Sequence, residues 1–347
     1  MKLDMAGRAS AAVRSAAFIG CKHVGHLPGV NLATTTLDLG DRIIPADVYR
    51  PRRSARPRST VVLVHGSTGH GHRDPRIIEL ARLMTLFDST IVVPLYEEIA
   101  AFHVSPGCST RVENTLSAML RRPSLLPDHG RIAVFATSFS CIYGLAAAGR
   151  PSVADRIGAL CLIGGVYTID PPLRALERED ESTFGSDLVL FNYLEASIGP
   201  APELKRAFQT ALADNSFRRE EPELPAVLAS LSPESRGLFS RLRRDVDLRR
   251  SHGQRMRPAL LELEQQAGDL ASLRARVTLM HGAGDTLVPA SETDKLRARL
   301  AGAGVAVHCE ISPLIAHMEA IRLRPGMAAA AARLISSFAR FFHEASL

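Results

Sequence analysis

Short runs of consecutive apolar residues alternate with stretches of helical periodicity along most of the chain. The apolar runs stand at residues 60–66, 89–96, 131–137, 156–165, 275–282 and 305–312. Consecutive apolar positions are typical of strands that are buried on both faces. Helical patterns lie between these runs, at residues 74–87, 108–122, 138–150 and 290–304, and a last one follows them at 326–345. This alternation predicts an α/β protein with a doubly wound, mainly parallel sheet.

The region before this alternation has a different pattern. Residues 32–39 and 42–50 are rich in β-forming side chains and are separated by Gly-Asp, which predicts a hairpin. We expect residues 1–31 to form a helical or irregular N-terminal segment. At the first long helical pattern, Asp74 is the expected N-cap and Pro75 the first helical residue.

The alternation stops between residues 166 and 273. That interval is rich in charged residues, Leu and Ala, and its prolines divide it into short helical patches without a strongly apolar run. A segment without such runs cannot supply buried strands to the sheet. We therefore expect a helical cap at 166–273, inserted into a core formed by residues 32–165 and 274–347.

Composition excludes several classes of protein. A chain of 347 residues with 46% hydrophobic and 22% charged residues is globular and long enough for one large domain with an insertion. The net charge of +6 comes from scattered arginines that do not alternate with aromatic residues, so no nucleic-acid partner is expected. The five cysteines have no CxxC spacing, which indicates reduced thiols in a cytoplasmic protein. We expect neither a membrane span nor a cleaved signal.

Three residues that can carry nucleophilic chemistry follow predicted strands. In an open parallel sheet, sites form at the carboxyl ends of the strands. Ser138 follows the run at 131–137, Asp285 follows the run at 275–282, and His317 follows the run at 305–312. From its position alone, Ser138 is either a nucleophile on a sharp turn or the N-cap of the next helix. Asp285 is either a catalytic acid or an aspartate that binds loop amides.

The order Ser, acid, His, together with the HG…G…DPR pattern at residues 65–76, resembles the α/β-hydrolase superfamily. The resemblance runs from about residue 32 to the end and is strongest to bacterial members with a helical cap. It implies the α/β-hydrolase fold and a catalytic triad of Ser138, Asp285 and His317. Asp170 is an alternative acid, because some relatives carry the acid after the preceding strand.

The resemblance also implies an oxyanion hole. Its backbone N–H donors would belong to Phe139 and to Ser67, with Thr68 as the alternative to Ser67. His65 would support the loop and would not act as a base. His70 and His72 lack a third ligand at metal-binding spacing, so we expect loop roles for them and no metal. His308 lies within a predicted strand and is expected to be a packed side chain.

The sequence departs from the family at the nucleophile. The G-x-S-x-G pattern stands here as Ala136-Thr137-Ser138-Phe139-Ser140. Small flanking residues are needed because strand and helix nearly touch at this turn. We expect Ser140 to lie beneath the cap and to narrow the space beside Phe139, so that Ser140→Gly would be tolerated. Ser140 is also the alternative working hydroxyl.

These residues predict a cofactor-free serine hydrolase, similar to carboxylesterases, that cleaves an ester or thioester through an acyl-enzyme. The expected partner is a small ester-like molecule, and a homodimer is left open. Two alternatives remain from the sequence. The chain is a catalytically inactive α/β-hydrolase scaffold that binds a small molecule or partner, as the changes at Ala136 and Ser140 suggest, or it is an acyltransferase with the same triad.

Overall fold

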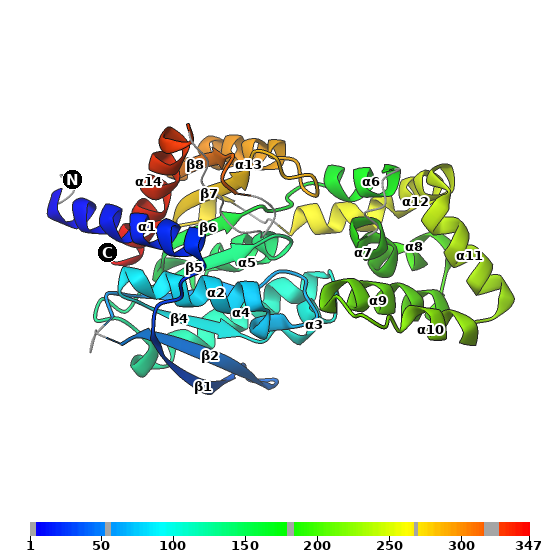
Figure 1. Ribbon diagram of the computed structural model, residues 1–347, viewed down its shortest axis with the longest axis horizontal. Helices are drawn as coiled ribbons and strands as arrows, with labels where there is room; N and C mark the ends of the chain where they lie inside the picture. Colours follow the sequence, from blue (N-terminus) through cyan, green and yellow to red (C-terminus); the bar gives the residue numbers. More distant parts are fainter. Residues whose placement is uncertain (1–4, 53–56, 179–183, 267–269, 316–325) are drawn as a thin grey trace.

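One twisted sheet forms the centre of the molecule (Figure 1). The computed structural model describes residues 5–52, 57–178, 184–266, 270–315 and 326–347. Within them the sheet has eight strands in the order β1-β2-β4-β3-β5-β6-β7-β8. They are β1 (Val30–Asp38), β2 (Ile43–Pro51), β3 (Ser59–Val64), β4 (Ser89–Pro94), β5 (Ile132–Thr137), β6 (Ile157–Ile163), β7 (Arg276–Gly282) and β8 (Val307–Ser312).

The strand directions confirm the predicted doubly wound sheet. Strands β1 and β2 pair antiparallel as the predicted hairpin, and β2 is antiparallel to β4. All other neighbouring pairs in the described sheet are parallel. The carboxyl ends of β3, β5, β6, β7 and β8 therefore lie along the same edge of the sheet, which is where the candidate residues were expected.

Helices cover both faces of the sheet. One face packs against α1 (Met5–Val24), α2 (Pro75–Met84) and α14 (Ala328–Ala345), and the other against α4 (Pro106–Leu120), α5 (Ser140–Ala148) and α13 (Ser291–Gly302). Val61 and Leu63 of β3 belong to the first core, and Val62 and Val64 to the second. Because successive strand residues point to opposite faces, a fully apolar strand serves both cores.

The N-terminal helix α1 is part of the first core. Its Phe18 is 2% exposed, and the Phe18 ring lies 4.6 Å from the ring of Phe338 in α14. Lys22 near the end of α1 forms an ion pair with Glu79 of α2. Shorter elements complete the core region: α3 (Glu97–Ala100) and the 3₁₀ turns η1 (Gly71–Arg73), η2 (Thr85–Phe87), η3 (Pro123–Leu125), η4 (Ala154–Arg156) and η5 (Leu270–Ser272).

A group of helices lies between β6 and β7 in the sequence. It comprises α6 (Asp170–Glu177), α7 (Phe184–Tyr193), α8 (Glu195–Ile198), α9 (Pro202–Phe217), α10 (Leu224–Ser230), α11 (Pro233–Arg244) and α12 (Val246–Gln265). We call residues 170–265 the helical insertion. Figure 1 shows it beyond one end of the core, opposite α1 and α14.

One buried arginine links helices within the insertion. Arg249 of α12 is 5% exposed and donates hydrogen bonds to the carbonyl oxygens of Leu176, Arg178, Leu242 and Arg243. These carbonyls lie at the ends of α6 and α11, where helical C=O groups lack partners within the helix. Among the described helices, none is both long and apolar enough to cross a membrane.

Candidate active site

Ser138 lies in a strained turn between β5 and α5. Its φ angle is +55°, a left-handed conformation that residues with a Cβ rarely adopt. The N-cap of α5 is Phe139 and not Ser138, so the simple capping role considered for Ser138 does not describe this turn. The Ser138 amide donates to the carbonyl of Ile163 in β6. This is the backbone geometry that a nucleophile elbow requires.

The residues around Ser138 show how the chain accommodates its departures from glycine. A Cβ built on Gly144 of α5 would lie only 3.0 Å from the Cβ of Ala136. Helix α5 therefore packs against β5 at a point where Ala136 carries the methyl group and Gly144 leaves the space. The strand and the helix therefore still approach closely, because the glycine of this contact lies on the helix, at Gly144, and not on the strand.

Ser140 does not occupy the place that we expected for it. Its side chain is 0% exposed, and Oγ donates to the carbonyl oxygen of His65 at 2.6 Å. The hydroxyl therefore ties α5 to the loop after β3 and does not narrow the cavity beneath the insertion. The prediction that Ser140→Gly is tolerated is therefore wrong, because removing the hydroxyl removes a buried donor.

We expect Ser140→Ala and Ser140→Gly each to lower the free energy of unfolding by about 1–3 kcal/mol, because the buried carbonyl of His65 loses its donor. Urea unfolding measures this change. Ser152→Ala is the matched control, since Ser152 donates its hydrogen bond to Glu113 in an exposed pair. Unfolding of the Ser140 variants at the wild-type urea concentration would contradict the structural role.

The loop after β3, residues 65–69, lies against the Ser138 turn. A Cβ on Gly66 would be 3.3 Å from the Cβ of Ser138, so the two segments touch. Ser67, Thr68 and Phe139 line the same cavity as Ser138. The proposed oxyanion donors therefore come from segments that the fold places side by side.

His65 is held as a neutral ring within this loop. Its Nε2 accepts a hydrogen bond from the backbone N–H of Tyr96, so the proton is on Nδ1, which donates to the carbonyl of Gly66. Burial lowers the pKa of His65 to about 4, although the hydrogen bond to the Gly66 carbonyl acts in the opposite direction and raises it. With both ring nitrogens engaged by backbone, His65 supports the loop, as the resemblance implied.

Asp285 is positioned by the loop after β7. Its side chain is 2% exposed, and Oδ1 accepts hydrogen bonds from the amides of Leu287 and Val288, both at 2.9 Å. Oδ2 lies 3.5 Å from Nε2 of the buried His281. These contacts hold the carboxylate in a fixed orientation, which a catalytic acid requires.

The chain after β8 returns to this loop. A Cβ on Gly282 would lie 2.4 Å from the carbonyl oxygen of Ile315, so only glycine fits at that point. His317 itself lies outside the described residues. Its role as the base therefore stays a prediction from the sequence. His308, in contrast, is described: its Nε2 is 2.8 Å from Ser337 Oγ of α14, as expected for a packed side chain.

The alternative acid, Asp170, has a different environment. It begins α6, its side chain is 50% exposed, and it forms an ion pair with Lys295 at 2.5 Å. The hydrogen bond from Lys295 lowers the pKa of Asp170. Neither Asp170 nor Asp285 is among the residues that line the cavity with Ser138, but Leu287 and Val288 of the Asp285 loop are.

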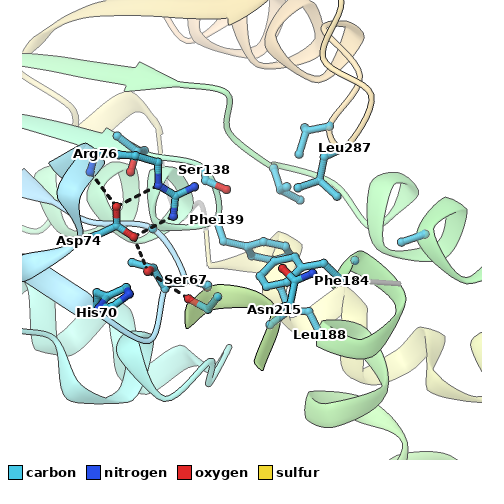
Figure 2. Close-up of a pocket in the computed structure, with 18 of the residues that line it drawn as sticks. Ser67, His70, Asp74, Arg76, Ser138, Phe139, Phe184, Leu188, Asn215 and Leu287 are labelled. Carbon is cyan, nitrogen blue, oxygen red and sulfur yellow. Dashed lines mark hydrogen bonds and ion pairs between the residues drawn. The ribbon is translucent and has the colours of Figure 1, made fainter. Parts of the chain in front are cut away.

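A cavity of about 660 Å³ opens beside Ser138 (Figure 2). The Ser138 turn and the loop after β3 form one wall. The helical insertion forms the other wall with Phe184, Leu188 and Asn215, and Leu287 of the Asp285 loop closes one side. A cavity of this size, lined by both apolar and polar side chains, suits a small organic molecule.

The insertion touches the loop after β3 directly. The amide of Gly69 donates to Ser216 Oγ at 2.9 Å, and a Cβ on Gly69 would lie 2.6 Å from the Phe217 ring. His70 packs edge-on against that ring at 4.6 Å. His72 is 6% exposed and lies 3.8 Å from Asp47. In the described part of the chain, no group of three or more His, Cys, Asp or Glu residues could hold a metal ion.

Sequence reasoning assigned no role to several residues at this site. Arg76 enters the sequence analysis only as part of the DPR pattern, and no sequence motif points to Ser216 or Arg218 of the insertion. Arg76 and Arg218 both line the cavity. The position of Arg76 two residues after the N-cap aspartate Asp74 could have indicated that the two side chains pair at the start of α2. The sequence around Arg218 has no comparable signal.

The sheet order, the flanking helices and the Ser138 turn together define the α/β-hydrolase fold. Among solved structures, the chain is similar to brefeldin A esterase, a bacterial homologue of human hormone-sensitive lipase, with 16% identity and a TM-score of 0.55 over 99% of this chain and 87% of that one. It is also similar to a fungal esterase from Rhizomucor miehei, with 16% identity and a TM-score of 0.54 over 98% and 92% of the two chains.

An esterase from Pyrobaculum calidifontis gives 17% identity and a TM-score of 0.52 over 99% of this chain and 93% of that one. At these identities the likeness establishes the fold. No protein-family model matches the sequence, and the search of curated proteins found no match.

Proposed function

We propose that the protein is a serine hydrolase that cleaves a carboxylic ester or thioester, with Ser138 as the nucleophile. The observation that carries this proposal is the left-handed backbone of Ser138 at the carboxyl end of β5, opening on the cavity of about 660 Å³. Strained backbone positions cluster at functional sites, and a serine at a strand-to-helix junction is where a nucleophile elbow holds its reactive hydroxyl. The esterase structures that share the fold support the same class of reaction.

In the proposed mechanism, Ser138 Oγ attacks the acyl carbon and transfers its proton to His317. The backbone amides of Ser67 and Phe139 donate to the oxyanion that develops. The leaving alcohol or thiol takes the proton from His317, and an acyl-enzyme remains on Ser138. Water, activated by His317, then releases the acid. Asp285 fixes the tautomer of His317 and stabilises its charged form. No cofactor or metal takes part.

We further propose that the helical insertion acts as a cap over this cavity. Its residues Phe184, Leu188 and Phe217 supply apolar side chains to the cavity that Ser138 also lines. Exclusion of water by such a wall strengthens the hydrogen bonds to the oxyanion. The same wall decides which acyl or alcohol groups enter.

The inactive-scaffold alternative rested on Ala136 and Ser140. Gly144 leaves room for the methyl group of Ala136, and the Ser140 hydroxyl bonds to the His65 carbonyl, so neither side chain obstructs the turn. These contacts favour the catalytic proposal. Hydrolysis and acyl transfer use the same triad and differ only in the acceptor that enters the acyl-enzyme.

A fluorophosphonate probe is expected to label the protein with one equivalent, at Ser138. Fragment mass spectrometry of the peptide distinguishes Ser138 from Ser140, and the Ser138→Ala variant should remain unlabelled. Ser152→Ala, on an exposed loop, is the matched control and should label as the wild type does. A folded protein that takes up no label would support the inactive scaffold. A label on Ser140 would identify Ser140 as the nucleophile in place of Ser138.

A further inference from the structure

The cavity beside Ser138 has an excess of positive charge. Among the described residues that line it, Arg76 and Arg218 are cationic and Asp74 is the one carboxylate. Within the described lining, two guanidinium groups stand against one carboxylate, which is an excess of one positive charge. An unbalanced charge inside a partly enclosed space attracts a ligand of opposite sign.

The Asp74 carboxylate is fully engaged by its neighbours. Arg76 donates to it from Nε at 2.9 Å and from one Nη atom at 2.8 Å, and Thr68 Oγ1 donates at 2.6 Å. Burial alone would raise the pKa of Asp74, but the hydrogen bonds from Arg76 and Thr68 lower it to about 2. Asp74 therefore stays ionised and holds the Arg76 side chain in a fixed orientation.

Arg76 keeps a donor for a ligand. Its side chain is 45% exposed, and in the described part of the chain its second Nη atom has no hydrogen-bond partner. Figure 2 shows the guanidinium projecting from Asp74 towards Ser138. A guanidinium that is fixed along one edge presents its other edge without further loss of side-chain entropy.

Arg218 approaches the cavity from the insertion. It ends α9 in a left-handed conformation with φ +50°, directly after Ser216 and Phe217, which contact Gly69. These two contacts fix the backbone from which Arg218 reaches the cavity. No described carboxylate forms an ion pair with Arg218, whereas the next residue, Arg219, pairs with Asp214 and Glu223.

We propose that the cavity selects esters that carry a carboxylate, which binds between Arg76 and Arg218. This inference rests on the proposed function, because it names the substrate class of the same site. A carboxylate matches the planar donor edge of a guanidinium. Its single charge also equals the excess charge of the described part of the wall, which favours it over a doubly charged phosphate. The ester carbonyl would then lie at Ser138.

The test compares 4-nitrophenyl hydrogen glutarate with its neutral methyl ester, 4-nitrophenyl methyl glutarate. We expect the wild type to prefer the anionic ester by about tenfold in kcat/KM, the effect of a charge-assisted hydrogen bond that water partly screens. Arg218→Gln should reduce that ratio to about twofold, and Arg218→Lys should restore part of it. The preference should also fall at high salt. A wild-type ratio of one or below would overturn the proposal.

Arg241→Gln is the matched control, because it removes the same charge from an exposed position of the insertion outside the cavity lining. Its kcat/KM ratio of the anionic to the neutral ester should equal that of the wild type. An equal fall of this ratio in Arg218→Gln and Arg241→Gln would show that the preference comes from the overall charge of the protein and would overturn the proposed site. A binding arm separates this proposal from the proposed function. By calorimetry in the Ser138→Ala background, monomethyl glutarate should bind more tightly than dimethyl glutarate does, and adding Arg218→Gln should reduce the difference to about twofold.

The binding arm does not depend on turnover. If neither ester is hydrolysed but monomethyl glutarate still binds preferentially, the hydrolase proposal fails and the anion site stands. If both esters are hydrolysed equally well and binding shows no preference, the anion site fails and the hydrolase proposal stands. Stronger binding of methyl phosphate than of monomethyl glutarate would also overturn the choice of a carboxylate.

Discussion

Ser138→Ala is expected to lower kcat for 4-nitrophenyl ester hydrolysis by about 10⁴-fold or more, with the fold intact. The methyl group cannot form the acyl-enzyme, so only the oxyanion donors and the binding contacts would remain to accelerate the reaction. Loss of the hydroxyl leaves the small side chain that the turn requires, and therefore the urea midpoint should stay close to that of the wild type. The rate is measured by following the absorbance of the released nitrophenolate in a continuous assay.

Ser140→Ala provides the comparison for this variant. It removes a hydroxyl two residues away that is buried against His65, so we expect a loss of stability and a fall in kcat of no more than about tenfold. A nearly active Ser138→Ala together with an inactive but folded Ser140→Ala would place the nucleophile at Ser140. Wild-type turnover in both variants would end the serine hydrolase proposal.

Asp285→Asn is expected to lower kcat by about 10⁴-fold, because an amide in place of the carboxylate favours the wrong histidine tautomer. The asparagine oxygen can still accept from the amides of Leu287 and Val288, so the loop should keep its conformation. Stability measured by urea unfolding separates loss of activity from loss of fold. Unchanged turnover would leave Asp285 with only its structural role.

Asp170→Asn is the matched control for the acid. It makes the same chemical change at a half-exposed aspartate whose partner is Lys295, and surface pairs of this kind contribute about 0–1 kcal/mol. We expect kcat within about threefold of the wild type. If Asp170→Asn were the damaging change and Asp285→Asn were not, the acid would be assigned to the loop after β6.

The sheet was predictable because its strands are encoded locally. Residues 61–64 and 132–136 are apolar at consecutive positions, which is required of β3 and β5 between two helical layers. Asp74 and Pro75 marked the start of α2 in the same way, and the Asp74 side chain accepts from the Arg76 amide as an N-cap should. Periodicity and capping act over a few residues, so the sequence displays them directly.

Ser140 shows where local reasoning failed. Its neighbours in the sequence suggested a side chain beneath the insertion, but its partner is the carbonyl of His65, 75 residues away. Gly144 likewise gained its meaning only from Ala136 on the facing strand. Neither contact has a sequence signal, because the packing of α5 on β5 sets the directions of these side chains.

The sequence by itself determined the parallel sheet, the helices on its faces and the junctions at which Ser138 and Asp285 stand, because hydrophobic periodicity and turn chemistry are local properties of the chain. Only the tertiary structure decided the left-handed backbone of Ser138, the neutral state of His65 and the meeting of Ser216 with Gly69, 147 residues apart. These features arise from burial and from contacts between distant segments. The close approach of such segments also places Arg76 and Arg218 in one cavity.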